Sequence, residues 1–292
     1  MTISPPRAWP AILSLIALLL LVLGVDVVLL VALVRSPVDA RSLIIGLVVA
    51  ASLPLLAALG YWLWGILTLR YSLDRNALVV YWAGSQHIIP LPSVIATAPA
   101  REAGVTPRVE GLRWLGYQIG QCDLPGIGKT LVFASRPFAE QVIVKTTTDA
   151  YALSPGDPDA FIDEMGARLR LGPTDYVAAE MRPNPWLGLG LWRDRLAYTL
   201  AGIAALSVII LFAWVSLRYA GLPESLFFGV SGLPLPRVSA LFLPTIGLIT
   251  LLGNAAFAVW VYRRQPAAAY LVLGGALAVQ VVVWIAALRG LV

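Results

Sequence analysis

Residues 65–82 read GILTLRYSLDRNALVVYW, and the chemical character of the chain changes within this stretch. The positions before Arg70 end an apolar run that begins at residue 43 and is long enough to cross a bilayer as a helix. After Tyr71, runs of β-branched and aromatic residues follow turn-forming residues such as Asp74 and Asn76. The sequence therefore predicts a polar, strand-rich insert, residues 71–172, between apolar helices.

The composition makes lipid the solvent for much of the chain. Of its 292 residues, 59% are hydrophobic and 13% are charged, whereas soluble domains carry about 25% charged residues. A bilayer core about 30 Å thick requires ~20 apolar residues, and a helix keeps the backbone of such a span hydrogen-bonded. We predict an N-terminal hairpin within residues 1–70 and three further helices within 196–292, with spans at 11–34, 43–69, 196–217, 238–262 and 267–288.

The first apolar run is expected to remain in the mature protein. It exceeds the ~7–15 apolar residues of a signal-peptide core, and Arg35 closes it as a stop-transfer flank does.

Basic residues in the short flanks predict the orientation, because Lys and Arg accumulate on the cytoplasmic side. The pair Arg263-Arg264 in the tight turn between the last two spans is the clearest signal, and it puts this turn inside. The N-terminus and the insert are then cytoplasmic and the C-terminus is outside. Residues 173–195 are predicted to form an interfacial linker, and the expected headgroup anchors are Trp186, Trp192, Arg193, Arg195, Arg263 and Arg264.

The net charge of +5 does not reside in the insert. Residues 71–172 hold nine basic and ten acidic residues, whereas the remaining residues hold twelve basic and six acidic ones. The basicity therefore belongs to the membrane flanks, and nucleic acid is not an expected partner.

Within the insert, the pattern predicts a meander of short strands closed by one amphipathic helix. Gly84-Ser85 is expected to turn a hairpin, and Asp157 can cap a helix that has Pro158 in its first turn. Phe161, Ile162, Met165 and Leu169 fall on one face of that helix. The predicted strands are 78–82, 87–90, 130–134, 141–145 and 150–153.

The insert resembles the bacterial pleckstrin-homology-like (PH-like) domains of membrane proteins. The most specific stretch is Tyr-x-Leu-Ser-Pro-x-Asp-Pro-x-x-Phe at residues 151–161, preceded by similar stretches at 71–80, 89–95 and 142–146. The resemblance implies a bent seven-stranded β-barrel capped by a C-terminal helix, so the fold class is an α+β membrane protein with an inserted PH-like barrel. It also implies a bacterial cytoplasmic membrane, a binding or assembly role, and no shared catalytic residues.

One departure from the wider PH superfamily concerns lipid headgroups. Members that bind them use a basic cluster in the loop after the first strand, whereas the matching turn Gly84-Ser85-Gln86 is uncharged. Phosphoinositide binding is therefore not expected.

No motif in the chain predicts catalysis, a cofactor or a metal site. Gly126-Ile127-Gly128-Lys129-Thr130 resembles a phosphate loop, but Asp123 stands where that motif requires glycine, and a strand follows, so we predict a turn. With one cysteine, Cys122, and one histidine, His87, the chain offers no Cys/His zinc cluster and no serine triad. The acids that follow Asp157 lie in the first turns of a helix, where the helix dipole favours carboxylates.

Asp26 is the one acidic residue inside a predicted span. A charge at the bilayer centre costs ~2.5–3.5 kcal/mol on insertion scales, so such residues usually face a bundle interior or a water-filled path. We predict a buried polar contact among Asp26, Asn254 and Gln280, with a proton or ion path as the alternative.

These patterns favour a non-enzymatic membrane protein whose insert docks a membrane-protein partner or further copies of the chain, as an accessory subunit. The alternative is a small transporter or channel component. The spans show no paired halves, which transporters built from repeats would have.

Overall fold

The computed structural model describes residues 2–36, 38–105, 107–184, 190–227, 234–262 and 264–290. They fall into two compact units, of which the first comprises residues 1–24 and 54–185 and the second 25–53 and 186–292.

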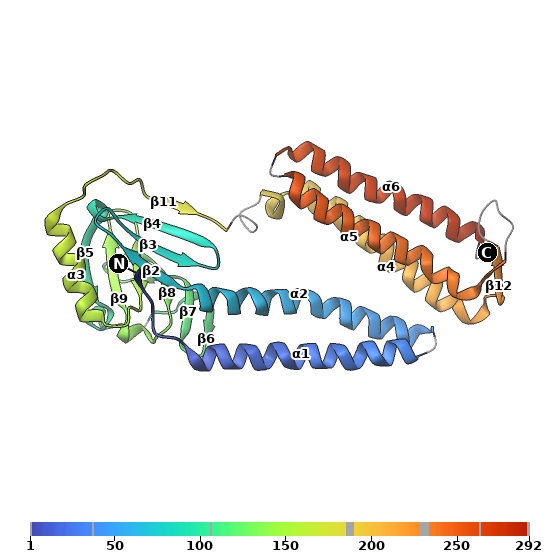
Figure 1. Ribbon diagram of the computed structural model, residues 1–292, viewed down its shortest axis with the longest axis horizontal. Coiled ribbons are helices and arrows are strands. Elements are labelled where there is room, and N and C mark those ends of the chain that lie inside the picture. The colour runs from blue at the N-terminus through green and yellow to red at the C-terminus, as the bar shows by residue number, and fades with distance from the viewer. Residues whose placement is uncertain are drawn as a thin grey trace. The chain divides into compact units, whose positions relative to one another are not determined.

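Among the described residues, five helices are long and apolar enough to cross a membrane, so the five predicted spans are confirmed as such helices. Pro54 lies inside the second of them, and Asp194 caps the N-terminus of the third by accepting from two backbone amides. The helices are α1 (Trp9–Arg35), α2 (Ala40–Thr68), α4 (Arg195–Arg218), α5 (Phe242–Tyr262) and α6 (Pro266–Gly290) (Figure 1).

Apart from an N-terminal strand at residues 2–3, the first sheet begins directly after α2, and it is antiparallel throughout. Asp74 Oδ1 accepts from the amides of Asn76 and Ala77 at 2.7 Å each and so makes the first turn. The predicted hairpin at Gly84 is confirmed, and its turn residues Ala83 and Gly84 both have positive φ, 46° and 79°. In spatial order the strands are β1 (Thr2–Ile3), β2 (Arg70–Leu73), β3 (Ala77–Trp82), β4 (Ser85–Pro90) and β11 (Glu180–Arg182).

The second sheet departs from the predicted meander. Its β10 lies between β8 and β9 and runs parallel to β8, so the chain passes β9 before it returns to the middle of the sheet. The predicted turn at Gly126 joins β7 to β8 and is confirmed. In spatial order the strands are β5 (Val94–Pro99), β9 (Val142–Thr146), β10 (Ala150–Leu153), β8 (Gly128–Ala134), β7 (Tyr117–Leu124) and β6 (Glu110–Trp114).

The predicted strands all appear, but the barrel is not confirmed. Among the described residues, the two sheets are separate in their strand pairing, and no closed barrel forms. The domain is a two-sheet structure with a helix at its end.

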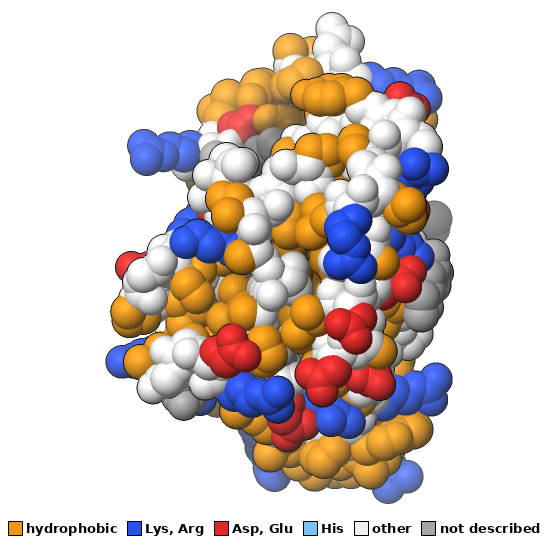
Figure 2. Space-filling model, turned by 90° about the vertical axis from the view of Figure 1, so that its left-hand side faces the viewer, with side chains coloured by type: hydrophobic (Ala, Val, Ile, Leu, Met, Phe, Trp, Pro, Cys, Tyr) orange, Lys and Arg blue, Asp and Glu red, His pale blue; other side chains and the backbone are white. Residues whose placement is uncertain are grey.

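That helix, α3 (Pro158–Leu171), has the predicted cap and face. Asp157 Oδ1 accepts from the amide of Ala160 at 3.0 Å, and Phe161 and Met165 are buried. Ion pairs such as Arg168 with Glu164, at 2.6 Å, mix the two signs of charge on this helix. The face that carries α3 and β5 accordingly shows basic, acidic and hydrophobic side chains interspersed (Figure 2).

In the second unit, α4, α5 and α6 pack against one another as a three-helix bundle (Figure 1). Its buried side chains form small separate clusters, and one of them contains Leu211, Val215 and Val283. Trp284 Nε1 donates to Ser207 Oγ at 3.0 Å and so joins α6 to α4.

Candidate functional site: the junction between the inserted domain and the first helical hairpin

The inserted domain and the base of the α1/α2 hairpin share one hydrophobic core. A single buried cluster contains Ala11 and Leu15 of α1, Ile66 of α2 and, from the domain, Tyr71 and Met165. The connection from α2 to β2 is short, and Thr68 Oγ1 at the end of α2 accepts from the amide of Ala83 at 3.1 Å. We call this region, within the first unit, the junction. It leaves the domain little freedom to rotate on the helices that carry it.

Two tryptophans of the domain contact the hairpin across the junction. Trp82, at the end of β3, packs so closely on Gly65 of α2 that a Cβ there would lie 2.6 Å from the indole Nε1. The same Nε1 donates to Tyr117 Oη at 2.5 Å. Trp114, at the end of β6, donates through Nε1 to Ser14 Oγ of α1 at 2.7 Å. Each helix of the hairpin is thus contacted by an indole ring from the domain.

Tyr117 is fully buried, and burial raises the pKa of its phenol above its ordinary value. Its hydroxyl therefore stays neutral near pH 7, and it accepts the indole hydrogen bond rather than exchanging protons. We therefore assign Tyr117 a structural role.

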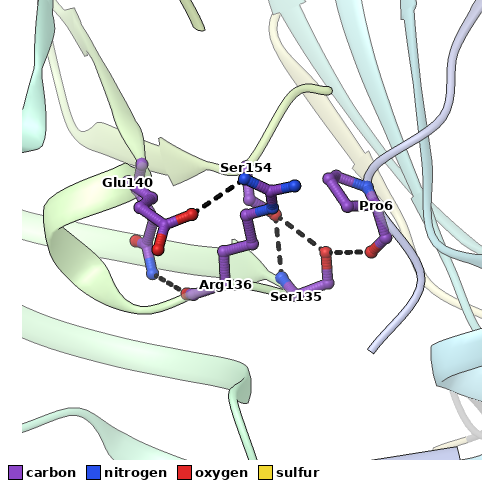
Figure 3. Close-up of polar contacts among 6 residues, drawn as sticks. Pro6, Ser135, Arg136, Glu140 and Ser154 are labelled. Carbon is purple, nitrogen blue, oxygen red and sulfur yellow. Dashed lines mark hydrogen bonds and ion pairs between the residues drawn. The ribbon is translucent and has the colours of Figure 1, made fainter. Parts of the chain in front are cut away.

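The N-terminal strap, residues 2–8, attaches α1 to the domain a second time. Its strand β1 pairs with β2, and the Pro6 carbonyl accepts from Ser135 Oγ at 2.6 Å (Figure 3). Ser154 Oγ in turn accepts from the amide of Ser135 at 2.8 Å. Tyr71 Oη donates to the Phe133 carbonyl at 2.6 Å. The strap is thus bonded to β2 and to Ser135, directly after β8. Ser135 is bonded in turn to the segment after β10, and Tyr71 of β2 is bonded to β8.

Burial raises the pKa of Tyr71 to about 12, although its hydrogen bonds with Ser154 act in the opposite direction.

The sequence analysis did not predict the strap or, within the first unit, the strands β2, β5 to β7 and β11. The Leu115-Gly116 turn between β6 and β7 carries the Gly signal of a hairpin and could have been found. The strap has no such signal.

The predicted intramembrane residues have identifiable neighbours. Asp26 is buried, and its Oδ2 accepts from Ser52 Oγ of α2 at 2.7 Å. Gln280 Nε2 donates to the Gly247 carbonyl of α5 at 3.0 Å. Among the described residues, no hydrogen bond joins Asp26 to Asn254 or to Gln280, so the three-residue contact stays a prediction.

Several predicted anchors fall outside the described residues, namely Trp186, Arg263 and the side chains of Trp192 and Arg193. Of the others, Arg195 is the first residue of α4, and the Arg264 guanidinium lies 4.8 Å from the centre of the Trp260 ring. That stacking is typical of an interfacial arginine.

Asp194 was not singled out from the sequence. Besides capping α4, its Oδ2 accepts from Tyr262 Oη of α5 at 2.8 Å and from Tyr270 Oη of α6. The hydrogen bond from Tyr270, followed by that from Tyr262, holds the pKa of the carboxyl below its usual value. One carboxylate thus joins the ends of three helices.

The described part of the domain contains no constellation with evident chemistry. His87 is buried in β4 with its ring 4.7 Å from that of Phe133, and burial lowers its pKa. Burial, with the nearby Asp123, raises the pKa of Cys122. Among the described residues, no group of three or more His, Cys, Asp or Glu could hold a metal ion. The arrangement can hold and orient the domain.

The strand order, the capped α3 and the junction together delimit a segment that begins at the end of α2. Residues 69–169 match the family model described as Bacterial PH domain. The predicted recognition is thereby confirmed, and the match covers the PH domain but none of the long apolar helices. Neither the curated proteins nor the solved structures gave a significant match.

Proposed function

We propose that this chain is a non-enzymatic, multi-pass membrane protein whose PH domain docks a membrane-protein partner, as an accessory or assembly subunit. In this proposal the N-terminus and the PH domain face the cytoplasm of a bacterium and the C-terminus lies outside. The observation that supports the proposal is the junction. Leu15, Ile66 and Met165 belong to one core, so a partner bound to the domain would also be held in place relative to the hairpin.

The outer face of the second sheet offers a docking surface for a protein. Beside the edge strand β5 lies a mainly apolar hollow of about 230 Å³. Glu102 and Lys145, of opposite charge, are among its lining residues, and Ile95 on the same strand is 62% exposed. A protein surface matches apolar lining with charges of both signs better than a phosphate group does.

A phosphoinositide is a poor candidate for the partner. The turn after the first strand of the domain, β2, is where PH superfamily members that bind headgroups are basic. In this chain its one basic residue, Arg75, donates to the carbonyls of Leu171 and Gly172.

The next turn, between β3 and β4, is uncharged and is covered by the protein itself. A Cβ on Gly84 would lie 2.7 Å from Asn184 Nδ2 and 3.0 Å from Trp64. Asn184 Nδ2 also donates to the Ala83 carbonyl at 2.6 Å.

The test is purification of the tagged full chain in mild detergent from its native membrane, with Ala96→Arg as the diagnostic variant. Ala96 is exposed and lines the hollow, so arginine fills the docking surface without disturbing the core. We expect a second membrane subunit to co-purify in a fixed ratio and to be lost from the Ala96→Arg preparation.

Tyr176→Arg is the matched control, since Tyr176 is 90% exposed and is not among the lining residues of the hollow. This variant should retain the partner. A chain that purifies alone and conducts ions in vesicles would instead establish the transporter or channel alternative, and a partner retained by Ala96→Arg would exclude this docking surface.

A further inference from the structure

The first two helices are longer than a bilayer requires. With 27 and 29 residues, α1 and α2 extend about 40 Å or slightly more, whereas ~20 residues cross a hydrocarbon core of about 30 Å. The surplus of α1 lies at its N-terminal end, where Ala11 and Leu15 are buried against the domain. One turn further on, Leu20 and Leu21 are 61% and 63% exposed, as lipid-facing residues are. About 20 residues counted back from Arg35, the last residue of α1, begin at Ile16, so the edge of the hydrocarbon lies close to Ser14 and Leu15.

Aromatic residues gather at this level of the first unit. Tyr61, Trp62 and Trp64 lie near the end of α2, and Trp114 of the domain bonds to Ser14. Figure 1 shows the β6–β7 hairpin beside the start of α1. Trp and Tyr concentrate at membrane interfaces because their rings are apolar at one end and polar at the other. The domain thus supplies part of the interfacial aromatic belt.

Leu115 forms the tip of that hairpin, directly after Trp114. It is 59% exposed and has φ of 42°, in the left-handed region. A side chain with a Cβ costs about 1 kcal/mol there, and Gly or Asn fits better. A single exposed leucine in water is ordinary. Leu115 differs from an ordinary exposed leucine because it follows Trp114 at a hairpin tip and has a strained backbone.

Exposed arginines lie in the hairpin tip and beside the ends of α1 and α2 that adjoin the domain. Arg113 precedes Trp114 and is exposed, and Arg7 and Arg70, at the two helix ends, are exposed as well. Arg7 lies 5.6 Å from the Trp9 ring and Arg70 4.6 Å from the Tyr81 ring. Basic side chains beside aromatic rings suit the phosphate level of a membrane.

We propose that the tip of the β6–β7 hairpin, residues 113–116, contacts the lipid bilayer itself, with Leu115 at the boundary between headgroups and acyl chains and Arg113 at the phosphates. The bilayer is then a second support for the PH domain, besides the junction, and it fixes which face of the domain points away from the membrane.

The experiment uses the full chain in nanodiscs of phosphatidylethanolamine and phosphatidylglycerol. Cys122→Ser removes the only cysteine, and Leu115→Cys then carries an environment-sensitive fluorophore. We expect its emission to be blue-shifted, to be quenched by lipids with a nitroxide near the headgroup, and to resist aqueous iodide.

Tyr176→Cys is the control, because Tyr176 is 90% exposed and lies outside the docking surface. Its neighbours Thr174 and Asp175 bond to Asn76, beyond the end of β2 that points away from α2. Its label should respond to iodide and not to the lipid nitroxide.

A second measurement does not depend on the thiol label. A photo-crosslinking phenylalanine analogue at position 115 should form a covalent lipid adduct, detected by mass spectrometry, and one at position 176 should not. Thermal unfolding of each variant, compared with the parent chain, identifies preparations in which the fold is intact. If position 115 behaves like position 176 in folded protein by both measurements, the hairpin tip lies in water and the proposal is overturned.

Discussion

The junction and the three-helix bundle both hold helices in place, but they do so through different interactions. At the junction, Leu15 and Ile66 belong to one continuous core shared with a water-soluble domain. In the bundle, the buried residues form small clusters, and polar contacts such as that of Gln280 join the helices. The difference follows from the solvent. Lipid tails are as apolar as leucine, so moving a leucine from lipid into a helix interface gains little free energy. Equivalent substitutions should therefore cost more at the junction.

The largest effect on stability is expected from replacing a tryptophan by alanine, and the same replacement can be made in both regions. Trp82→Ala removes an indole that packs on Gly65 and bonds to Tyr117, and we expect a loss of about 3 kcal/mol in the free energy of unfolding. Trp284→Ala removes an indole bonded to Ser207 in the bundle, and lipid can fill part of the space, so about 1 kcal/mol is expected. Denaturant titration in detergent, followed by circular dichroism, measures both.

Trp9→Ala is the control for these variants, because Trp9 is 53% exposed at the start of α1 and should tolerate the change. Equal losses for Trp82→Ala and Trp284→Ala would contradict the distinction between the two regions.

The second prediction concerns pH at the junction. Tyr71→Phe leaves the amide of Ser154 and the Phe133 carbonyl without the phenol that they bond, at a cost of about 1–3 kcal/mol near pH 7. The folded-state pKa of Tyr71, about 12, lies above the ordinary 10.0, so its stabilisation is complete below pH 10 and is lost as pH rises toward 12. The difference in stability between the parent and Tyr71→Phe should therefore shrink over this range.

Alkaline titrations of both proteins, monitored by thermal unfolding, measure that difference. Tyr176→Phe should follow the parent at every pH, since Tyr176 is 90% exposed. A constant difference between the parent and Tyr71→Phe from pH 9 to 12 would show that the phenol is not buried in the folded chain.

How far the sequence could predict this structure depends on the range of the interactions. The five spans and the capped α3 follow from local composition, and Asp157 with Pro158 is a local signal. The placement of β10 beside β8 and the pairing of the strap with β2 depend on contacts between distant segments. No periodicity within either segment encodes its partner.

The candidate site illustrates the same limit. Trp82 and Trp114 could be recognised as ends of strands, but their bonds to Tyr117 and Ser14 join separate elements. Asp26 was recognised by its charge in an apolar run, whereas its partner Ser52 carries no signal, because serine is common in helices that cross membranes.

The third prediction moves to the bundle. Asp194→Ala removes both the cap of α4 and the acceptor of the Tyr262 and Tyr270 hydroxyls, so the thermal midpoint should fall, by less than in Tyr71→Phe. Asp194→Asn keeps a capping oxygen, so its thermal midpoint should fall less than that of Asp194→Ala.

The folded-state pKa of Asp194 is lowered. The stabilisation by its carboxylate is therefore present above the ordinary pKa and is lost as pH falls through the lowered value. Thermal midpoints of the parent and of Asp194→Asn, measured as the pH is lowered, test this loss. Identical dependence of the two midpoints on pH would contradict the role of the carboxylate.

The smallest effect is expected at Gln280, the most buried polar residue of the bundle at 1% exposed. Its Nε2 bonds a backbone carbonyl, but its Oε1 has no hydrogen-bond partner among the described residues. Leucine in its place loses a bond of about 0.6 kcal/mol and removes an unsatisfied oxygen, so Gln280→Leu should unfold within about 0.6 kcal/mol of the parent. Gly247→Ala is the companion variant, since its Cβ would meet that Oε1 at 3.1 Å and should be better tolerated once leucine replaces Gln280. A loss of several kcal/mol in Gln280→Leu would instead place this residue in a polar network of the bundle, and the contrast with the apolar junction would no longer rest on packing alone.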